Sequence, residues 1–332
     1  MLCLVPHLFP PARLVEAAAQ DLRLPALEFL LARGTRLPCP AEGVEAALCG
    51  ALGIERQQDW PLAPITLVAD GGEPGGAYWL RADPVHLRVM RDRIVLADSE
   101  LLALSREEAD ALAATVGRHF GAELDPLPLH PQRWYLRFAE APRLATTPLS
   151  VAVGRDIEPL LPQGSDALAF RARLNELQML LHEHPVNQAR EARGELPVNS
   201  LWLWGGGRLP ASSGKTPSLY AVDSEAQALA AFCGAQAHPP PAHPDARLMK
   251  TDGVIQLDAL TPAGQAGDAY GWREALRGLE HHWFVPLRDL LRRIGPQGLH
   301  LVDPVNGMAL HLRAGDAWRL WRRPRRLASL LS

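Results

Sequence analysis

The sequence predicts an α/β protein with a mostly parallel sheet flanked by helices, and two observations lead to this class. Short apolar segments of strand type alternate with helical segments over residues 218–312, at the spacing that is typical of βαβ units. Hydrophobic residues make up 47% of the 332 residues and charged residues 21%, as in a globular protein with a large buried core.

Charge and cysteine content argue against several classes of function. The net charge of −3 gives no electrostatic reason for nucleic acid or an anionic membrane to be the main partner. The four cysteines have no metal-type spacing, and so few in a chain of this length indicate reduced thiols. No apolar stretch reaches the roughly 18–20 residues of a membrane span, and the first residues lack the basic region of a signal peptide. We therefore expect a cytoplasmic protein without a membrane partner.

The N-terminal part of the chain has helical periodicity. Apolar residues recur at helical spacing over residues 12–31, with a second helix starting at Pro25, and again over residues 44–52. Proline and glycine then become frequent over residues 60–76, around a strand-like run at 65–68. We expect a domain boundary there.

The rest of the chain mixes both kinds of element. Ser105 with Glu108 forms a capping box that predicts a helix to about Phe120. A helix over residues 167–184 is followed by another that starts at Pro185 and ends at Gly194. The remaining expected elements are strands at 78–96, 134–138, 149–153, 200–204, 218–222, 254–257, 299–302 and 308–312, and helices at 224–234 and 271–293.

Three motifs have simpler explanations than the chemistry they suggest. The segment from Gly205 to Thr216 is similar to a phosphate-binding loop, but Leu209 interrupts the required spacing, which favours a flexible loop. His182 and His184 point to different faces of a helix, so we interpret them as helix-end histidines and expect no metal site. Tryptophan and arginine alternate over residues 318–326, where a terminal strand with a solvated tail is favoured over binding to bases or membranes.

Polar residues in the segment 187–208 are the strongest indication of a ligand site. Asn187 and Arg190 are three residues apart and share one helix face, while Asn199 and Arg208 bracket an apolar strand. That strand ends in three glycines, where backbone N–H groups could approach a ligand, namely Gly205, Gly206 and Gly207. Two amides and two guanidinium groups suit a small phosphorylated or carboxylate ligand. The alternative is a structural polar network that ties the helix to the strand.

The same segment resembles a known family. Its sequence HPVN, followed by Arg190, PVN, a tryptophan-rich strand and GGG, is similar to the archaeal-type 2,3-bisphosphoglycerate-independent phosphoglycerate mutases of the alkaline phosphatase superfamily. Weaker likeness extends over residues 25–34, 80–87 and 263–271. The subgroup that the chain resembles is a degenerate bacterial one that includes a regulator of pathogenicity-factor production.

The resemblance implies a domain plan and a set of site residues. It implies a phosphatase-like core of residues 1–62 and 198–332, with residues 63–197 inserted as a smaller α+β domain. It also implies that Arg81 lies where the family has a substrate arginine. We expect Arg81, Asn187, Arg190 and Arg208 to converge on one ligand.

The chain departs from the family at its catalytic positions. In the family, two divalent metals held by aspartate and histidine activate a serine that carries the phosphoryl group. The expected nucleophile region, residues 40–48, contains no serine, and three metal-ligand positions are occupied by Thr261, Gln265 and Pro304. We therefore assign no catalytic residue, metal or cofactor.

The function predicted from the sequence is that of a mutase-like pseudoenzyme, regulatory or sensing, that binds a small anion or a protein partner. One alternative is an active mutase or phosphoryl-transfer enzyme with unrecognised metal ligands. The other is a structural protein-interaction module.

Overall fold

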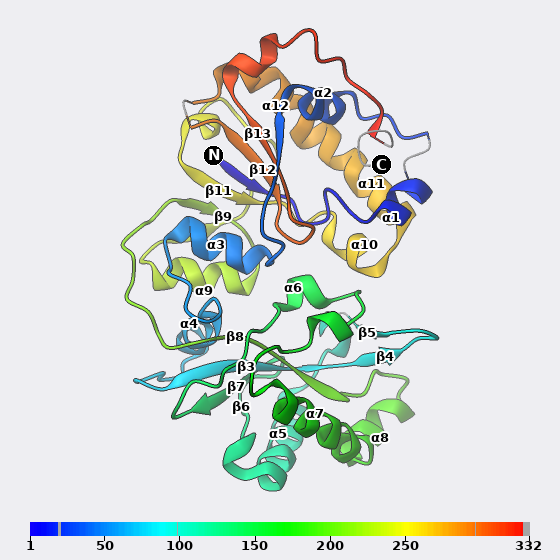
Figure 1. The fold of residues 1–332 in the computed structure, drawn as a ribbon, viewed down its shortest axis with the longest axis vertical. Helices are drawn as coiled ribbons and strands as arrows, with labels where there is room; N and C mark the ends of the chain where they lie inside the picture. Colours follow the sequence, from blue (N-terminus) through cyan, green and yellow to red (C-terminus); the bar gives the residue numbers. More distant parts are fainter. Residues whose placement is uncertain (19–20, 98, 296, 328–332) are drawn as a thin grey trace. The chain divides into compact units, whose positions relative to one another are not determined.

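Two units, each with its own sheet, make up the computed structural model, which describes residues 1–18, 21–97, 99–295 and 297–327 (Figure 1). The first unit comprises Met1–Gly53 and the chain from Gly214 onward, and the second comprises Ile54–Ser213. The sequence analysis placed these boundaries at residues 62/63 and 197/198. The second boundary differs because strand β8 (Ser200–Gly207) pairs with β3 (Tyr78–Val85) and so belongs to the sheet of the second unit, and the first differs because the chain from Ile54 onward already belongs to that unit.

The described residues of the first unit form a seven-stranded, mostly parallel sheet, and the expected fold class is confirmed. In spatial order across the sheet, the first five strands run parallel to one another, while β13 is antiparallel to both of its neighbours. Cys3 lies opposite both Ile255 and Leu301, which fixes the register at the centre. The strands, in spatial order, are β10 (Ala237–His238), β9 (Ser218–Tyr220), β11 (Gly253–Gln256), β1 (Leu2–Leu4), β12 (Leu299–Asp303), β13 (Met308–Leu312) and β2 (Thr35–Pro38).

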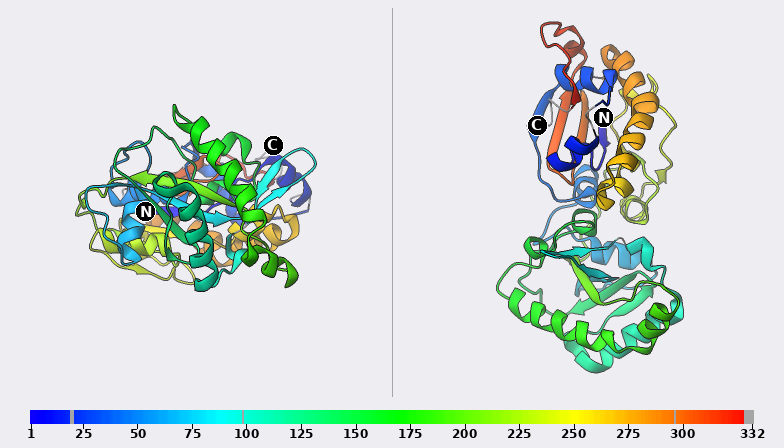
Figure 2. Two further views of the ribbon diagram at one scale, coloured as in Figure 1. Left: turned by 90° about the horizontal axis from the view of Figure 1, so that it is seen from below. Right: turned by 90° about the vertical axis from the view of Figure 1, so that its right-hand side faces the viewer.

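Helices flank this sheet. The right-hand view of Figure 2 shows α11 (Ala269–Leu279) and α12 (Val285–Leu290) alongside the strands. Their buried residues, such as Trp272 and Leu287, share one core with Cys3 and Leu301 of the sheet. The other α-helices described in this unit are α1 (Ala12–Ala18), α2 (Pro25–Arg33), α3 (Val44–Leu52), α9 (Ser224–Phe232) and α10 (Thr261–Ala266).

A buried carboxylate joins two of these helices. A π-helical turn (Glu280–Phe284) links α11 to α12 and buries Glu280. Its two oxygens accept hydrogen bonds from the backbone N–H groups of Ala26 (2.6 Å) and Leu27 (3.0 Å) at the start of α2. Glu280 thereby supplies hydrogen-bond acceptors for two N–H groups in the first turn of α2, which have no acceptor within the helix.

The second unit has an antiparallel sheet with helices on both faces. The order is β6 (Leu127–His130), β7 (Arg133–Phe138), β3 and β8. Helices α5 (Arg106–Phe120) and α7 (Ala167–His182) cover one face, and α4 (Leu62–Ala69) packs on the other. The unit also contains α6 (Leu149–Ala152), α8 (Pro185–Ala192) and the hairpin of β4 (Leu87–Val89) with β5 (Ile94–Leu96).

Local signals in the sequence predicted several helix ends correctly. The Ser105 hydroxyl accepts from the N–H of Glu108, whose carboxylate accepts in turn from the N–H of Ser105, so the capping box is confirmed. Helix α8 begins at Pro185, and Gly194 follows it with a positive φ of 75°, a backbone conformation that glycine adopts without strain.

Two expected strands are helices instead. Residues 65–68 belong to α4, and residues 149–153 fall largely in α6. Helix α4 is buried on nearly all sides, so its apolar run lacks the periodicity that separates a helix from a strand. Thr66 is accommodated because its hydroxyl donates to the carbonyl of Leu62 at 2.9 Å.

The expected terminal strand is also absent from the described residues. The chain forms a short 3₁₀ helix at Ala314–Trp318, and Trp318 and Trp321 are exposed by 60% and 76%. Arg319 and Arg322 donate to the carbonyls of Arg33 and Gly34, so this segment contacts the junction between α2 and the edge strand β2 without forming a strand of its own.

No helix among the described residues is long and apolar enough to cross a membrane.

Candidate functional site

All eight residues that the sequence analysis selected as ligand contacts lie in the second unit. Their hydrogen bonds show what each one does in the folded chain. The structure gives them several separate sets of hydrogen-bond partners.

Arg190 lies inside the protein and is 1% exposed. Its Nη1 donates to Glu108 Oε2 at 2.6 Å, its Nε donates to the carbonyl of Leu196 at 2.9 Å, and its Nη2 donates to the carbonyl of Leu102. Glu108 also caps α5, so Arg190 connects α8 to the start of α5. Binding a ligand would require Arg190 to give up charge-assisted hydrogen bonds.

The two asparagines complete backbone hydrogen bonding. Asn187, on α8, donates to the carbonyls of Leu181 and Val198 and accepts from the N–H of Val198. Asn199 accepts from the N–H of Leu87 at 2.7 Å and donates to its carbonyl at 2.9 Å. The bonds of Asn187 join α8 to the residue two positions before β8, as in the helix-to-strand network that the sequence analysis gave as the alternative to a ligand site, whereas those of Asn199 join the start of β8 to β4 (Leu87–Val89).

The three glycines permit close packing of β8. A Cβ atom at Gly205 would lie 3.0 Å from Leu62 Cβ, one at Gly206 would overlap the Tyr78 hydroxyl, and one at Gly207 would lie 2.6 Å from Pro61 Cβ. Residues 61 and 62 lead into α4, so small residues let this helix approach the strand.

Arg208, beyond the strand, is exposed, and its guanidinium donates to the carbonyls of Gly76 and Ala139. It shares none of these partners with Arg190.

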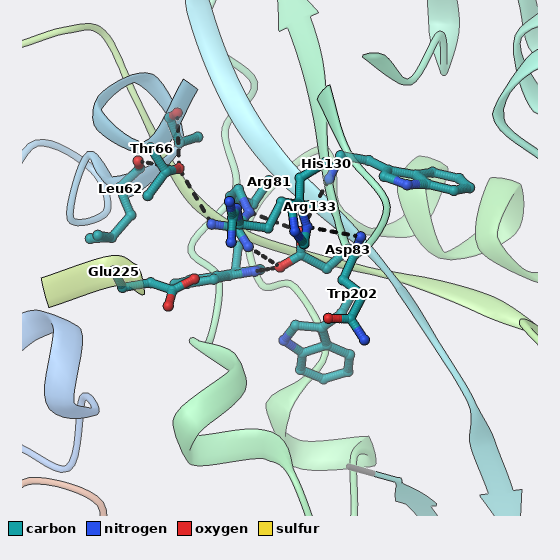
Figure 3. A network of polar contacts seen from close by, with 12 residues as sticks. Leu62, Thr66, Arg81, Asp83, His130, Arg133, Trp202 and Glu225 are labelled. Atoms are coloured by element: carbon teal, nitrogen blue, oxygen red, sulfur yellow. Dashed lines mark hydrogen bonds and ion pairs between the residues drawn. The ribbon is translucent and has the colours of Figure 1, made fainter. Parts of the chain in front are cut away.

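Arg81 is the centre of a third set of contacts, on the face of the sheet that α4 covers. Its Nε and Nη2 each donate to Asp83 at 2.8 Å, and its Nη1 donates to the Thr66 hydroxyl at 3.3 Å. Figure 3 shows Arg81 between Thr66 and Asp83. The guanidinium also lies over the Trp204 ring, 4.9 Å from its centroid. Arg81 and Asp83 are 2% and 1% exposed, so this is a buried ion pair.

The eight residues thus form separate contacts within the protein. Arg190 and Arg208, which we expected to converge, have no hydrogen-bond partner in common among the described residues. Ion pairing with local carboxylates explains this for Arg81 and Arg190, because a buried guanidinium requires nearby acceptors. Binding of an anion by these residues stays a prediction.

The carboxyl edge of the first unit's sheet is a second candidate. The parallel strands β9, β11, β1 and β12 end at the same edge, which is where open α/β sheets bind ligands. Residues at or soon after these four ends are Asp223, Gln256, Asp258, His7 and Asp303. The sequence analysis did not select any of them as site residues, although polar residues directly after expected strands are a recognisable signal.

Asp303, the last residue of β12, is fully buried at 0% exposure. Its Oδ1 accepts from the N–H groups of His7, Val305 and Asn306, each at 3.1 Å. Its Oδ2 accepts from the N–H of Phe9 and from the side-chain amide of Asn306, both at 2.9 Å. Five donors from two turns therefore converge on one carboxylate, which joins the loop after β1 to the turn before β13.

Asp223 and Asp258 are in a different electrostatic environment. The pKa of Asp223 is raised to about 6, mainly by burial and also by the nearby charges of Glu225 and Asp258, against the lowering effect of the hydrogen bond from the N–H of Ala226. Burial also raises the pKa of Asp258, against the hydrogen bond that Gln256 donates to its carboxylate at 3.0 Å. Asp223 Oδ1 accepts from the N–H of Ala226 at 2.8 Å as the N-cap of α9, whereas its Oδ2 is buried and has no hydrogen-bond partner among the described residues.

Cys39, which directly follows β2, is a nucleophile-type side chain in contact with Asp303. Its Sγ lies 3.9 Å from the carbonyl of Asp303. Burial and the negative charge of Asp303 raise the pKa of the thiol, so little thiolate forms at neutral pH. Cys39 is therefore poorly suited to replace a catalytic serine.

The donor set at this edge does not fit a pair of divalent metal ions. Such ions need several carboxylate or imidazole ligands, and no group of three His, Cys, Asp or Glu side chains in the described ranges is close enough to hold one. Both oxygens of Asp303 already accept N–H donors. Thr261 and Gln265 lie on α10, where neither provides a carboxylate or an imidazole.

Comparison with known proteins identifies mutases as relatives. No family model matches the chain. It is 41% identical over 64 residues to a 2,3-bisphosphoglycerate-independent phosphoglycerate mutase of Methanothrix thermoacetophila, a match covering 19% of this chain and 16% of the relative. It is 27% identical over 154 residues to a probable mutase of the same name from Geobacter sulfurreducens, covering 45% of this chain and 38% of the relative. The matches therefore span well under half of either relative's length.

Among solved structures, the chain is similar to a cofactor-independent phosphoglycerate mutase of Thermoplasma acidophilum. The TM-score is 0.44 and the identity 16%, over 99% of this chain and 93% of that one.

Proposed function

We propose that this chain, which resembles the 2,3-bisphosphoglycerate-independent phosphoglycerate mutases, is a non-catalytic relative with a regulatory or sensing role that binds a small anionic ligand. The observation that supports the non-catalytic part of the proposal is the saturation of Asp303 by five N–H donors, while the anionic ligand and the regulatory role extend the expectation from the sequence. A carboxylate so engaged stabilises two turns and has little capacity left for a metal ion.

Two further observations support the same proposal. The expected nucleophile region has no serine, and the raised pKa of Cys39 keeps its thiol protonated. Without an activated nucleophile and metal ions that neutralise phosphoryl charge, phosphoryl transfer lacks its two main sources of rate enhancement.

An active phosphoryl-transfer enzyme is the alternative, and the sequence identity of 41% to a named mutase is the observation that favours it. That likeness covers 64 residues, so the activity of the whole relative does not follow from it.

An activity assay separates the two. We expect no interconversion of 2- and 3-phosphoglycerate and no hydrolysis of p-nitrophenyl phosphate by the purified chain, with Mn²⁺, Mg²⁺, Co²⁺ or Zn²⁺ added in turn. Turnover of about 1 s⁻¹, a low but ordinary enzymatic rate, would contradict the proposal. The control is the same purification from cells that carry the empty expression vector, because turnover from a contaminating mutase would be present in that preparation too.

A further inference from the structure

A cavity of about 290 Å³ lies within the second unit, remote in sequence from the carboxyl edge described above. Its walls come from the β4–β5 hairpin, the segment 157–162, one face of α7 and the start of β8. Its apolar lining includes Leu87, Ile94, Leu174 and Trp202. Pockets of this kind, mostly apolar with a few polar groups, are the usual form of small-molecule sites.

The polar groups of the cavity come mainly from one helix. Arg171, Asn175 and Gln178 follow one another at spacings of four and three on α7, so they share the face that lines the cavity. The side-chain amides of Asn175 and Gln178 form no hydrogen bond with another described residue.

The guanidinium of Arg171 has only long contacts within the protein. Its Nη2 donates to the carbonyl of Pro162 at a long 3.4 Å, and its Nη1 is 3.8 Å from Glu158 Oε1. Its Nε is buried without an acceptor among the described residues. A buried N–H without an acceptor is unfavourable, so the protein itself satisfies this guanidinium poorly. By contrast, Arg190 in the same unit has an acceptor for each of its three nitrogen atoms.

We propose that this cavity binds a small monocarboxylate with an apolar body, the carboxylate pairing with Arg171 and the body lying against Leu174 and Trp202. Nη1 and Nη2, which have only long contacts within the protein, form a guanidinium edge that can pair bidentately with a carboxylate. A phosphate dianion is disfavoured because Glu158 lies beside the same guanidinium and would repel a second negative charge. The volume corresponds to roughly ten water molecules, which limits the ligand to about that many non-hydrogen atoms.

The proposal goes beyond the proposed function and does not depend on it, because a catalytically active mutase could carry the same cavity. Its test therefore measures binding and not turnover.

The probe is hexanoate, titrated into the full chain and followed by calorimetry and by the indole N–H resonance of Trp202. That indole donates to the carbonyl of Thr147 at 2.8 Å, and the Trp202→Phe variant assigns its signal. Hexan-1-ol is the uncharged comparison with the same chain length. We expect one hexanoate per chain, binding at least about tenfold tighter than hexan-1-ol, because a charge-assisted pair is lost in the alcohol.

Arg171→Gln should weaken hexanoate binding at least about tenfold while leaving the binding of hexan-1-ol nearly unchanged. Arg173→Gln is the matched control: Arg173 lies on the same helix and pairs with Glu123 at 2.7 Å, outside the cavity lining. Ile94→Trp, which places a larger side chain at the half-open wall, should weaken both probes.

Three results would overturn the proposal. They are no hexanoate binding at millimolar concentration, equal affinity for hexanoate and hexan-1-ol, and an equal loss of affinity in the Arg171→Gln and Arg173→Gln variants.

Discussion

Asp303 and Asp223 lie near one edge of the same sheet, and both have buried carboxylate oxygens. Of the two, only Asp303 has a described hydrogen-bond donor for each oxygen. Five N–H groups donate to the carboxylate of Asp303, whereas Asp223 has the N–H of Ala226 for Oδ1 and no described partner for Oδ2. The pKa of Asp223 is accordingly raised to about 6 by burial, from an ordinary value of about 4. The two acids therefore differ in their supply of hydrogen-bond donors.

The raised pKa of Asp223 predicts a specific pH dependence of stability. Below about pH 4 the residue is protonated in both states, and between about pH 4 and 6 only the unfolded chain ionises, so the free energy of unfolding falls as pH rises. Asp223→Asn stays neutral and keeps an oxygen for the N–H of Ala226. Urea denaturation should therefore give the variant about 1–3 kcal/mol more stability at pH 8 and no advantage at pH 4.

The exposed Asp289 provides the control for this measurement, since its carboxylate is 61% accessible. Asp289→Asn should change stability little at either pH. An Asp223→Asn variant less stable than the wild type at pH 8 would show that the ionised carboxylate is favoured in the folded chain.

At the scale of elements, the three glycines that end β8 determine how closely α4 packs against that strand. Gly206 has no space for a methyl group because the Tyr78 hydroxyl occupies the position, and this hydroxyl is itself buried without a hydrogen-bond partner among the described residues. Tyr78 is on β3, so the constraint acts within the β3–β8 pair. A glycine triplet that suggested a phosphate loop is thus explained by strand and helix packing.

Gly206→Ala should lower the free energy of unfolding by about 1–3 kcal/mol, measured by chemical denaturation, because the methyl group overpacks against Tyr78. Tyr78→Phe removes the overlapping hydroxyl and should recover part of the loss in the double variant. Gly76→Ala is the control, since a methyl group there would meet no atom within 4 Å. Equal losses in the Gly206→Ala and Gly76→Ala variants would point to backbone entropy or conformation rather than overpacking.

At the scale of the whole molecule, each unit has its own buried core. Residues such as Trp272 and Leu301 form the core of the first unit, and Trp134 and Leu203 lie in a separate core in the second. Separate cores predict separate cooperative unfolding units, even though the chain passes from the first unit to the second and back.

Hydrogen exchange with mass spectrometry would test this prediction. Asp303→Asn should lower protection by about 3 kcal/mol in peptides of the first unit, because it leaves buried N–H groups facing an amide. Gly206→Ala should lower protection in peptides of the second unit only. A uniform loss of protection over both units in either variant would show that the chain unfolds as one cooperative structure.

The sequence by itself determined the elements whose signals are local. The capping box at Ser105, the helix start at Pro185 and the βα alternation of the C-terminal part depend on near neighbours, and the fold class follows from them. Fully buried runs such as α4 gave no periodicity, so their type was decided by packing.

Only the tertiary structure decided which sheet β8 joins and what the selected polar residues contact. The spacing of Asn187 and Arg190 correctly placed them on one helix face, but spacing does not specify whether that face meets a ligand or the interior. Here the interior contains Glu108 and the carbonyl groups of Leu102 and Leu196, and a guanidinium there is stable only if it pairs with them. Likewise, Asp303 became a structural residue because the turns after β1 and β12, nearly 300 residues apart in the chain, direct their N–H groups at one carboxylate. Such convergence depends on chain pairing at long range, which local sequence patterns do not encode.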